Sequence, residues 1–191
     1  MIRLREKYQK EVVPALMKKF GYKNIMAVPK IEKVVLNTGF GKQIISKGSD
    51  EQKKHTESVL EQMALIAGQR PVLTIAKKSI ASFKLRQGMA IGAAVTLRKK
   101  KMYDFLERLI CITLPRTRDF RGIDQKSFDQ RGNLSTAIRE HISFLEIAPE
   151  KARFIFGLEV VITTSAKTKE EGIELLKLLG FPIKKIADKE I

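Results

Sequence analysis

The pattern of apolar and polar positions predicts helices and strands that do not alternate regularly along the chain. Apolar residues spaced as on one helical face predict helices at residues 2–20, 50–67, 103–114 and 168–179. Stretches rich in β-branched residues predict strands at residues 31–38, 71–76, 89–97 and 158–164. A doubly wound parallel sheet would require strict alternation. We therefore expect an α+β fold: an antiparallel-rich sheet with helices packed on one face and long basic loops.

Glycine, proline and polar capping residues mark the ends of several elements. Pro14 should kink the first helix or end it, and Gly21 is placed to cap its C-terminus. Thr168 and Glu171 form a capping box at the start of the last helix, and Gly180 can cap its end. The segments without clear periodicity are expected to be loops, at residues 39–50, 77–87 and 115–133.

Length and composition limit the class of protein. The 191 residues, 43% of them hydrophobic, predict one folded domain with two joined halves, at about residues 1–101 and 102–191. No apolar run approaches the roughly 20 residues of a membrane span. The N-terminus lacks a signal-peptide core, so a cytoplasmic location is expected. The single cysteine, Cys111, excludes an intrachain disulfide and is expected in the core, on the apolar face of a helix.

Positive charge is concentrated in the first half of the chain. The formal net charge is +16; residues 1–101 carry 22 basic and 7 acidic side chains, and residues 102–191 carry 15 and 14. Such an excess favours a polyanionic partner. A membrane surface would call for a Lys/Arg-rich amphipathic helix, and the excess lies elsewhere. RNA or DNA is therefore the favoured partner, and a composition that is basic by chance is the alternative.

One stretch concentrates this charge. Residues 62–103 contain no carboxylate, although a surface built for solubility alone mixes both signs. An acidic side chain there would repel a phosphate, so we expect this stretch to form an RNA-binding surface in the N-terminal half. Its nine basic residues are Arg70, Lys77, Lys78, Lys84, Arg86, Arg98, Lys99, Lys100 and Lys101.

Motifs of enzymes and cofactor sites are incomplete. Gly39 and Gly41 begin a dinucleotide-binding pattern, but Ile44 stands in place of its third glycine and no βαβ unit follows. His55 and His141 are the two histidines, and with one cysteine they cannot form a conventional zinc site. We therefore expect no catalytic residues, no metal and no cofactor.

Three aspartates among basic residues leave one enzymatic alternative open. A magnesium-dependent nuclease could use such carboxylates. Nothing in their spacing requires it, and salt bridges within a basic loop explain them better. The alternatives to a structural RNA-binding protein are thus a basic RNA-processing nuclease and a free-standing nucleic-acid-binding regulator. The three residues are Asp119, Asp124 and Asp129.

Residues 68–88, GQRPVLTIAKKSIASFKLRQG, form a motif within the basic stretch. The motif resembles the signature of the bacterial large-subunit ribosomal protein L-five family, whose members bind 5S rRNA. Segments on both sides resemble the family in the same order: GYKNIMAVPKIEKVVLNTGFG at residues 21–41, FLERLICITLPRTRDFRG at residues 105–122 and GLEVVITTSAK at residues 157–167. The resemblance covers almost the whole chain, and several independent segments in one order are a specific signal.

The resemblance implies a structural constituent of the large ribosomal subunit that is ribosome-bound in the cytoplasm. It would bind 5S rRNA and attach it to the large-subunit rRNA in the central protuberance. A loop would contact the P-site tRNA, and another segment would form an intersubunit bridge with a small-subunit head protein. The implied rRNA-binding residues are Asn37, Thr38, Gln69, Arg70, Thr74, Arg98, Lys99 and Lys100. The implied tRNA-contact loop contains Lys77, Lys78, Ser79, Phe83 and Lys84. The implied bridge segment contains Arg116, Arg118, Asp119, Phe120 and Arg121.

The chemistry of these residues suits RNA, with alternatives. The Asn37 amide can pair with base edges or ribose hydroxyls, and Arg70 can bind phosphate bidentately. Phe83 can stack on an exposed base or anchor its loop in the core. The run at residues 98–101 can contact RNA or form a solvated strand end. Asp119 among arginines suits a protein partner better than a phosphate.

The sequence departs from the family pattern in places. Ile75 stands where a basic residue is frequent and Ser82 where glycine is frequent, so the loop has less charge and less backbone freedom. Ile75, Phe83 and the apolar strand at residues 89–97 are expected to belong partly to the fold. Residues 43–54 are longer and more polar than the usual connection, and residues 186–191 resemble an extension. We assign no function to either segment.

Overall fold

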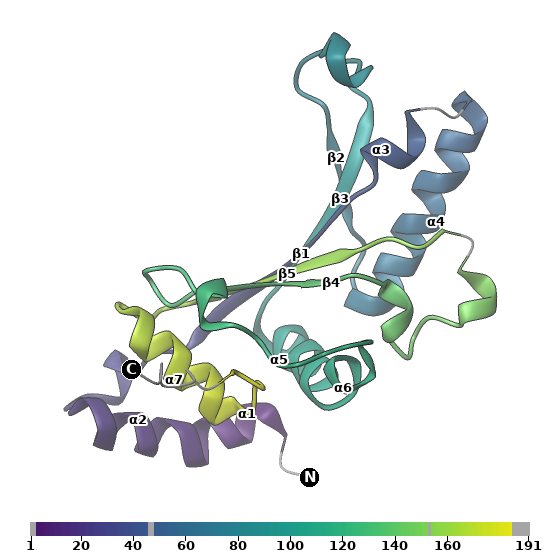
Figure 1. The fold of residues 1–191 in the computed structure, drawn as a ribbon. Coiled ribbons are helices and arrows are strands. Elements are labelled where there is room, and N and C mark those ends of the chain that lie inside the picture. Colours follow the sequence, from purple (N-terminus) through teal and green to yellow (C-terminus); the bar gives the residue numbers. More distant parts are fainter. Residues whose placement is uncertain (1–2, 46–47, 153, 185–191) are drawn as a thin grey trace, which may run out of the picture. The chain divides into compact units, whose positions relative to one another are not determined.

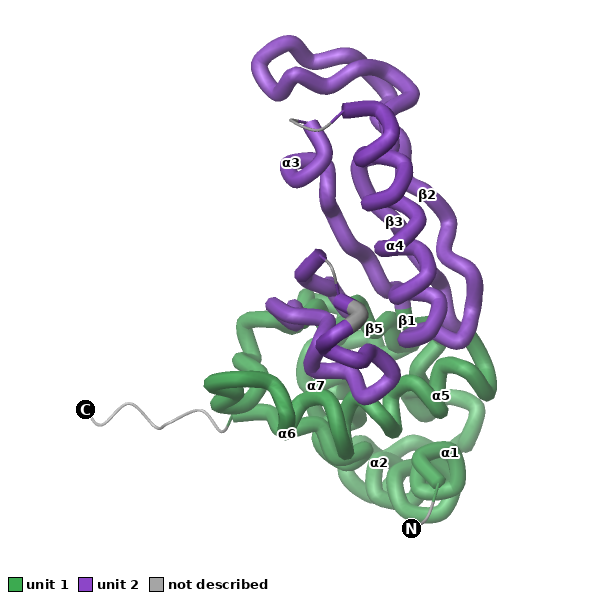
Figure 2. The backbone as a smooth tube through the Cα atoms, turned by 90° about the vertical axis from the view of Figure 1, so that its right-hand side faces the viewer, with its two compact units in different colours: residues 1–34, 98–136, 161–191 green, residues 35–97, 137–160 purple. Residues whose placement is uncertain are grey.

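Two compact units make up the chain, and each is assembled from separated stretches of sequence. The computed structural model describes residues 3–45, 48–152 and 154–184. Unit 1 contains residues 1–34, 98–136 and 161–191, and unit 2 contains residues 35–97 and 137–160 (Figure 2). Each unit therefore takes residues from both expected halves. That the chain forms a single domain stays a prediction. The expected extension at residues 186–191 lies outside the described residues.

An antiparallel sheet joins strands that are distant in the sequence. In the described part of the chain its five strands follow the order β2-β3-β1-β5-β4 (Figure 1). The expected α+β class is confirmed, and so are four predicted strands. The pattern missed β4, which is a run of five residues with apolar ends and thus a weak signal. The strands are β1 (Ile31–Gly39), β2 (Val72–Ile75), β3 (Ala90–Leu97), β4 (Leu134–Ile138) and β5 (Leu158–Thr164).

Two helices of unit 1 contain a π-helical turn that ends two residues before a proline. The first consists of α1 (Leu4–Lys7), η1 (Tyr8–Val12) and α2 (Val13–Phe20). The second consists of α5 (Lys99–Arg108), η4 (Leu109–Thr113) and α6 (Leu114–Arg116). In a π turn the backbone bonds reach one residue further back, here from the Val13 N–H to the Tyr8 carbonyl. The helix therefore continues through Pro14, whose ring lacks an N–H and would crowd a regular turn.

Cys111 is not in the core, so that expectation is wrong. Its side chain is exposed, whereas Leu109 and Thr113 in the same turn are buried. Helix α5 begins at Lys99, four residues before the predicted start at residue 103. The buried face of α5 and of η4 after it passes through Phe105 and Leu109. A residue two positions after Leu109 lies on the opposite side of the helix, because consecutive residues are about 100° apart.

Residues 39–50, expected to be a loop, are partly helical. Helix α3 covers Gly41–Ile44, and α4 (Ser49–Ala67) confirms the helix predicted at residues 50–67. The Gln43 amide nitrogen donates to the Ile155 carbonyl at 3.2 Å, and its oxygen lies 3.0 Å from Nε2 of His55. Ile155 is 112 residues and His55 is 12 residues from Gln43 along the chain. A local sequence pattern therefore does not predict that these two residues hold the segment in place.

The last helix, α7 (Lys169–Leu179), has the caps that the sequence predicts. Thr168 Oγ1 accepts a hydrogen bond from the Glu171 N–H at 3.3 Å, and Glu171 Oε2 accepts one from the Lys167 N–H at 2.8 Å. Gly180 ends the helix with a φ of 106°. The predicted boundaries of this helix are thereby confirmed.

Two glycines bring α7 into direct backbone contact with a turn of unit 1. A Cβ on Gly172 would overlap the Gly132 backbone, and a Cβ on Gly132 would lie 2.9 Å from the Gly172 Cα. The Asn133 side-chain oxygen accepts from the Thr164 N–H at 2.9 Å and fixes the same turn to β5. Only glycine allows the two backbones to approach this closely.

Short 3₁₀ turns fill several connections. All the described helices are too short or too polar to span a bilayer. The turns are η2 (Ile25–Ala27), η3 (Ala81–Phe83), η5 (Gln125–Ser127), η6 (His141–Ser143) and η7 (Pro149–Lys151).

Candidate nucleic-acid interface

A basic hairpin in unit 2 carries the largest group of predicted site residues. We call residues 69–88 the hairpin surface. Strand β2 is at the edge of the sheet, and it pairs antiparallel with β3 from Val72 opposite Ala94 to Ile75 opposite Ala90. All four side chains of β2 are exposed, and so are Gln69 and Arg70 before it. Neither face of β2 is covered, so its side chains are available to a partner.

The loop at the end of this hairpin has a defined backbone. Ile80 and Leu85 form a bridge with backbone hydrogen bonds of 3.0 and 3.1 Å. Ser79 Oγ accepts from the Gln87 N–H at 2.9 Å. Lys84 adopts a φ of 51°, which closes the η3 turn. The predicted loop is therefore a structured hairpin end, and the Ser79 hydroxyl stabilises it.

Exposed cations and apolar side chains alternate over the hairpin surface. Phe83 is 63% exposed and Ile75 is 55% exposed. The alternative in which Phe83 anchors its loop in the core is therefore wrong. Ile75 belongs to the fold through its backbone, which pairs with Ala90 of β3, while its side chain is exposed. The buried residues of β3 confirm the same expectation for residues 89–97. The loop cations are exposed as well: Lys77, Lys78, Lys84 and Arg86.

Asn37 and Thr38 lie together in unit 2 but differ in accessibility. Thr38 is 6% exposed, and its hydroxyl donates to the Gly157 carbonyl at 2.8 Å, so it stabilises the fold. Asn37 is half-buried and lines a shallow groove of about 290 Å³ formed by β1, β4 and β5. Arg139 and Glu159 line the same groove. Sequence reasoning did not associate them with Asn37, because only the strand order brings them together.

The basic run at residues 98–101 lies in unit 1 and opens helix α5. Arg98 is the N-cap residue, and the three lysines that follow form the first turn, all exposed. The alternative in which this run is a solvated strand end is therefore wrong, because these residues begin a helix. Cations at a helix N-terminus oppose the helix dipole. An anionic partner would relieve this electrostatic cost.

The predicted bridge segment begins at Arg116, the last residue of α6, and continues as a loop of unit 1. Its three arginines and Asp119 are exposed, and Phe120 is half-buried. The Ile123 N–H donates to the Pro182 carbonyl at 2.8 Å, which fixes the loop where it returns to the fold. The segment is thus attached firmly at its end and presents mixed charge.

Two of the three neighbouring aspartates accept hydrogen bonds from the backbone, where salt bridges within the loop were expected. Asp124 accepts from the Lys126 N–H at 2.9 Å, and Asp129 accepts from the backbone N–H groups of Arg131 and Asn133 at 2.9 and 2.7 Å. These carboxylates stabilise turns. Burial alone would raise the pKa of Asp129, but the hydrogen bonds from Asn133 and Arg131 lower this pKa. Within the described residues, His, Cys, Asp and Glu nowhere gather in threes that could hold a metal ion.

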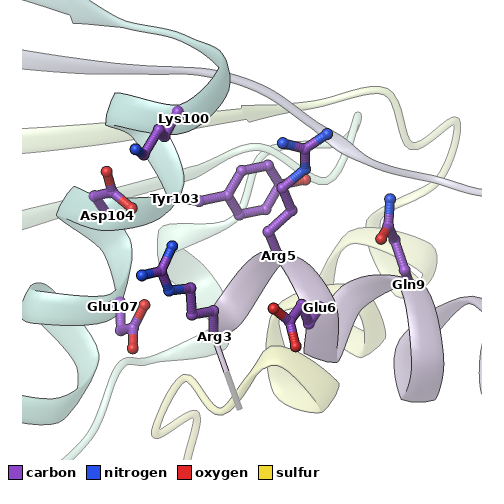
Figure 3. A pocket seen from close by; sticks show the side chains of 8 residues that line it. All are labelled: Arg3, Arg5, Glu6, Gln9, Lys100, Tyr103, Asp104 and Glu107. Atoms are coloured by element: carbon purple, nitrogen blue, oxygen red, sulfur yellow. The ribbon is translucent and has the colours of Figure 1, made fainter. Parts of the chain in front are cut away.

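A pocket in unit 1 combines both signs of charge (Figure 3). It has a volume of about 260 Å³ and lies between α1 and α5. Three cations face three carboxylates, which disfavours a phosphate ligand. Tyr103 lies in this pocket; burial raises its pKa, and the charge of Arg5 opposes this effect. The lining residues are Arg3, Arg5, Glu6, Gln9, Lys100, Tyr103, Asp104 and Glu107.

We expect acid to destabilise the protein through His141. This side chain is fully buried and stacks on Phe156 with ring centroids 4.0 Å apart. Burial lowers its pKa from the ordinary value of 6.5. The unfolded chain then binds the proton more readily, so stability is complete above about pH 6.5 and falls as the pH decreases below it, by at most about 1.4 kcal/mol per pH unit.

Urea unfolding at pH 7.5 and pH 5.5 measures this effect. The His141→Phe variant should show a smaller loss of stability between the two pH values. An equal loss in both proteins would assign the acid sensitivity to other groups.

Known proteins are similar in sequence to this chain over nearly its whole length. The family model for ribosomal protein L5 matches residues 24–86, and the model for the C-terminus of the same ribosomal family matches residues 90–183. The large ribosomal subunit protein uL5 of Geotalea daltonii is 56% identical over 184 residues, covering 96% of this chain and 99% of the relative. Those of Desulforapulum autotrophicum and Clostridium perfringens are 58% and 53% identical, over 96% and 95% of this chain and 99% and 98% of the relatives. The resemblance expected from residues 68–88 is confirmed, and the chain belongs to the ribosomal protein L5 family, a family of structural proteins of the large ribosomal subunit.

Proposed function

We propose that this protein binds 5S rRNA and attaches it to the large-subunit rRNA in the central protuberance. The hairpin surface supports this proposal most strongly. It presents Arg70, Lys77 and Lys78 to solvent on a structured hairpin within an interval that contains no carboxylate. Such a surface attracts phosphates and lacks groups that repel them.

Shape and unpaired bases supply specificity in this proposal. Side chains cannot read the deep groove of A-form RNA, so sequence-specific contacts reach loops and splayed bases. Phe83 offers an exposed ring for stacking, Arg70 a planar fork for phosphate, and Asn37 an amide in the groove of unit 2. Gln69 and Thr74 are exposed beside them and complete the rRNA-binding surface. Arg98, Lys99 and Lys100 form a further contact at the start of α5.

The two projecting loops have separate proposed partners. The hairpin end, with Lys77, Lys78, Ser79, Phe83 and Lys84, contacts the P-site tRNA. The segment at residues 116–121 contributes to an intersubunit bridge with a small-subunit head protein. Its exposed arginines surround Asp119, and this mixture suits a protein surface better than a phosphate backbone.

The two alternative functions have less support. A nuclease would need free carboxylates for magnesium, whereas Asp124 and Asp129 accept hydrogen bonds within their own turns. A free-standing regulator and a ribosomal protein differ in the nucleic acid that they bind, so competition between RNA and DNA distinguishes them.

We expect the full-length protein to form a stable, salt-sensitive complex with a 5S rRNA transcript. Each phosphate neutralised contributes about −0.7 to −0.9 to the slope of log affinity against log salt. Filter binding from low to moderate salt measures the slope. The RNA should keep its length with magnesium present, and duplex DNA should compete poorly. Magnesium-dependent cleavage would favour the nuclease, and equal competition by DNA would favour the regulator.

A further inference from the structure

The connection between α2 and β1 in unit 1 ends in an exposed apolar tip. We call residues 23–27 the apolar tip. Ile25 is 64% exposed and Met26 is 80% exposed, although both are large hydrophobic side chains. Val28 and Pro29, directly after the tip, are buried. The chain thus returns to the core directly after the tip.

Hydrogen bonds within the tip hold it in one conformation. The Asn24 side-chain oxygen accepts from the Met26 N–H at 2.9 Å, and its carbonyl accepts from the Ala27 N–H at 3.0 Å. The Val28 N–H donates to the Ile25 carbonyl at 3.2 Å. A tip ordered in advance loses little conformational entropy when it binds a partner.

The base of the tip is fastened to the rest of unit 1 on the side of α7. Lys19 forms a salt bridge of 2.8 Å with Glu174. Tyr22 forms a hydrogen bond with Glu171; burial and this contact raise the pKa of Tyr22 to about 12, so the hydroxyl keeps its proton. These contacts also engage two carboxylates of α7, Glu171 and Glu174.

The other side of the base is fastened as well. The Tyr8 hydroxyl donates to the Pro29 carbonyl at 3.0 Å. The Lys30 N–H donates to Ser165 Oγ at 3.0 Å, and the Ser165 N–H donates to the Lys30 carbonyl at 2.9 Å. Ile25 and Met26 thus project from a rigid support.

The charge around the tip is positive. Residues 12–31 contain no Asp or Glu, and they hold four lysines, which makes this a second acid-free interval outside the hairpin surface. Lys23 and Lys30 flank the apolar pair, and both are exposed. A protein partner would match the apolar pair, but lysine is depleted from protein interfaces. A membrane would require a longer amphipathic helix than the three-residue turn η2.

We propose that the apolar tip is a second RNA contact, separate from the hairpin surface. Ile25 and Met26 pack against the faces of unstacked bases and remove apolar surface from water. Lys23 and Lys30 neutralise the adjoining phosphates. The inference rests on the proposed rRNA binding and adds to it a contact in unit 1 that uses different residues.

The Ile25→Ser/Met26→Ser double variant of the full chain tests this proposal. Its affinity should fall about tenfold or more, because the loss of two apolar contacts costs several times RT. The salt slope should stay unchanged, because apolar contacts release no counterions. The Lys23→Gln/Lys30→Gln variant should instead reduce the slope by about 0.7 to 0.9 per lysine. The probes are a 5S rRNA transcript and deproteinised large-subunit rRNA, measured separately to identify which RNA meets the tip.

Leu145→Ser is the matched control, because Leu145 is 60% exposed and lies beside Glu146 and not among lysines. It should leave both affinities unchanged, and all variants should melt at the wild-type temperature. If the wild-type protein binds neither RNA, the proposed function fails. If it binds and the apolar variant binds both RNAs equally well, the tip proposal alone is overturned, and a protein partner becomes the better explanation.

Discussion

Reversing Arg70, Lys77 and Lys78 together to glutamate should lower the affinity for 5S rRNA about a hundredfold or more at moderate salt. Each change removes an attractive contact with phosphate and adds a repulsive charge in its place. All three side chains are exposed. The thermal unfolding temperature should therefore stay close to that of the wild type. Filter binding over a salt series and a melting curve measure the two effects.

A variant with the same change in net charge provides the control. Lys126, Lys167 and Lys177 are exposed in unit 1, in the part of the chain where acidic and basic residues balance. Reversing them should reduce RNA affinity far less. An equal loss in both variants would mean that net charge, and not the hairpin surface, determines binding. Global unfolding of the first variant would show that its residues are structural.

Replacing Gly172 with alanine should destabilise the protein by about 2 to 4 kcal/mol. In an ordinary helix the same change stabilises by up to about 1 kcal/mol, so the sign of the effect is informative. Here the new methyl group would overlap the Gly132 backbone, which the turn at residues 129–133 cannot easily move. Urea unfolding measures the free energy.

Gly39→Ala is the matched control for this change. No other atom lies within 4 Å of the position that a methyl group on Gly39 would take, and Gly39 has no positive φ. The substitution should change stability by less than about 1 kcal/mol. A neutral or stabilising Gly172→Ala would mean that α7 can separate from the Gly132 turn without cost.

The fold was predictable where local chemistry determines the element. Helix α7 carries its own caps at Thr168 and Gly180, and β5 is a compact run of β-branched residues, so both boundaries matched. Strand β4 and helix α3 depend on neighbours that are distant in the sequence, and periodicity cannot reveal them. The predicted burial of Cys111 was wrong for another reason: the continuous apolar run has an exposed side as well as a buried one.

The candidate site was predictable in its composition but not in its geometry. The absence of acidic residues correctly predicted that the hairpin surface is an exposed basic element. It did not reveal that the Thr38 hydroxyl bonds to Gly157, or that Asn37 shares a groove with Arg139. Both facts follow from the strand order, which places β1 beside β5 and β5 beside β4.

The interleaving of the two units has a consequence for synthesis of the chain. A nascent polypeptide emerges from its N-terminus, yet unit 1 needs residues 161–191 to complete its set of segments. The first helix packs against α7 through η1, in which Val12 is buried, so this contact forms only after residues 35–97 of unit 2 have been synthesised. During that delay the apolar face of the first helix lacks this partner and is exposed to solvent, as in a folding intermediate that is prone to aggregation.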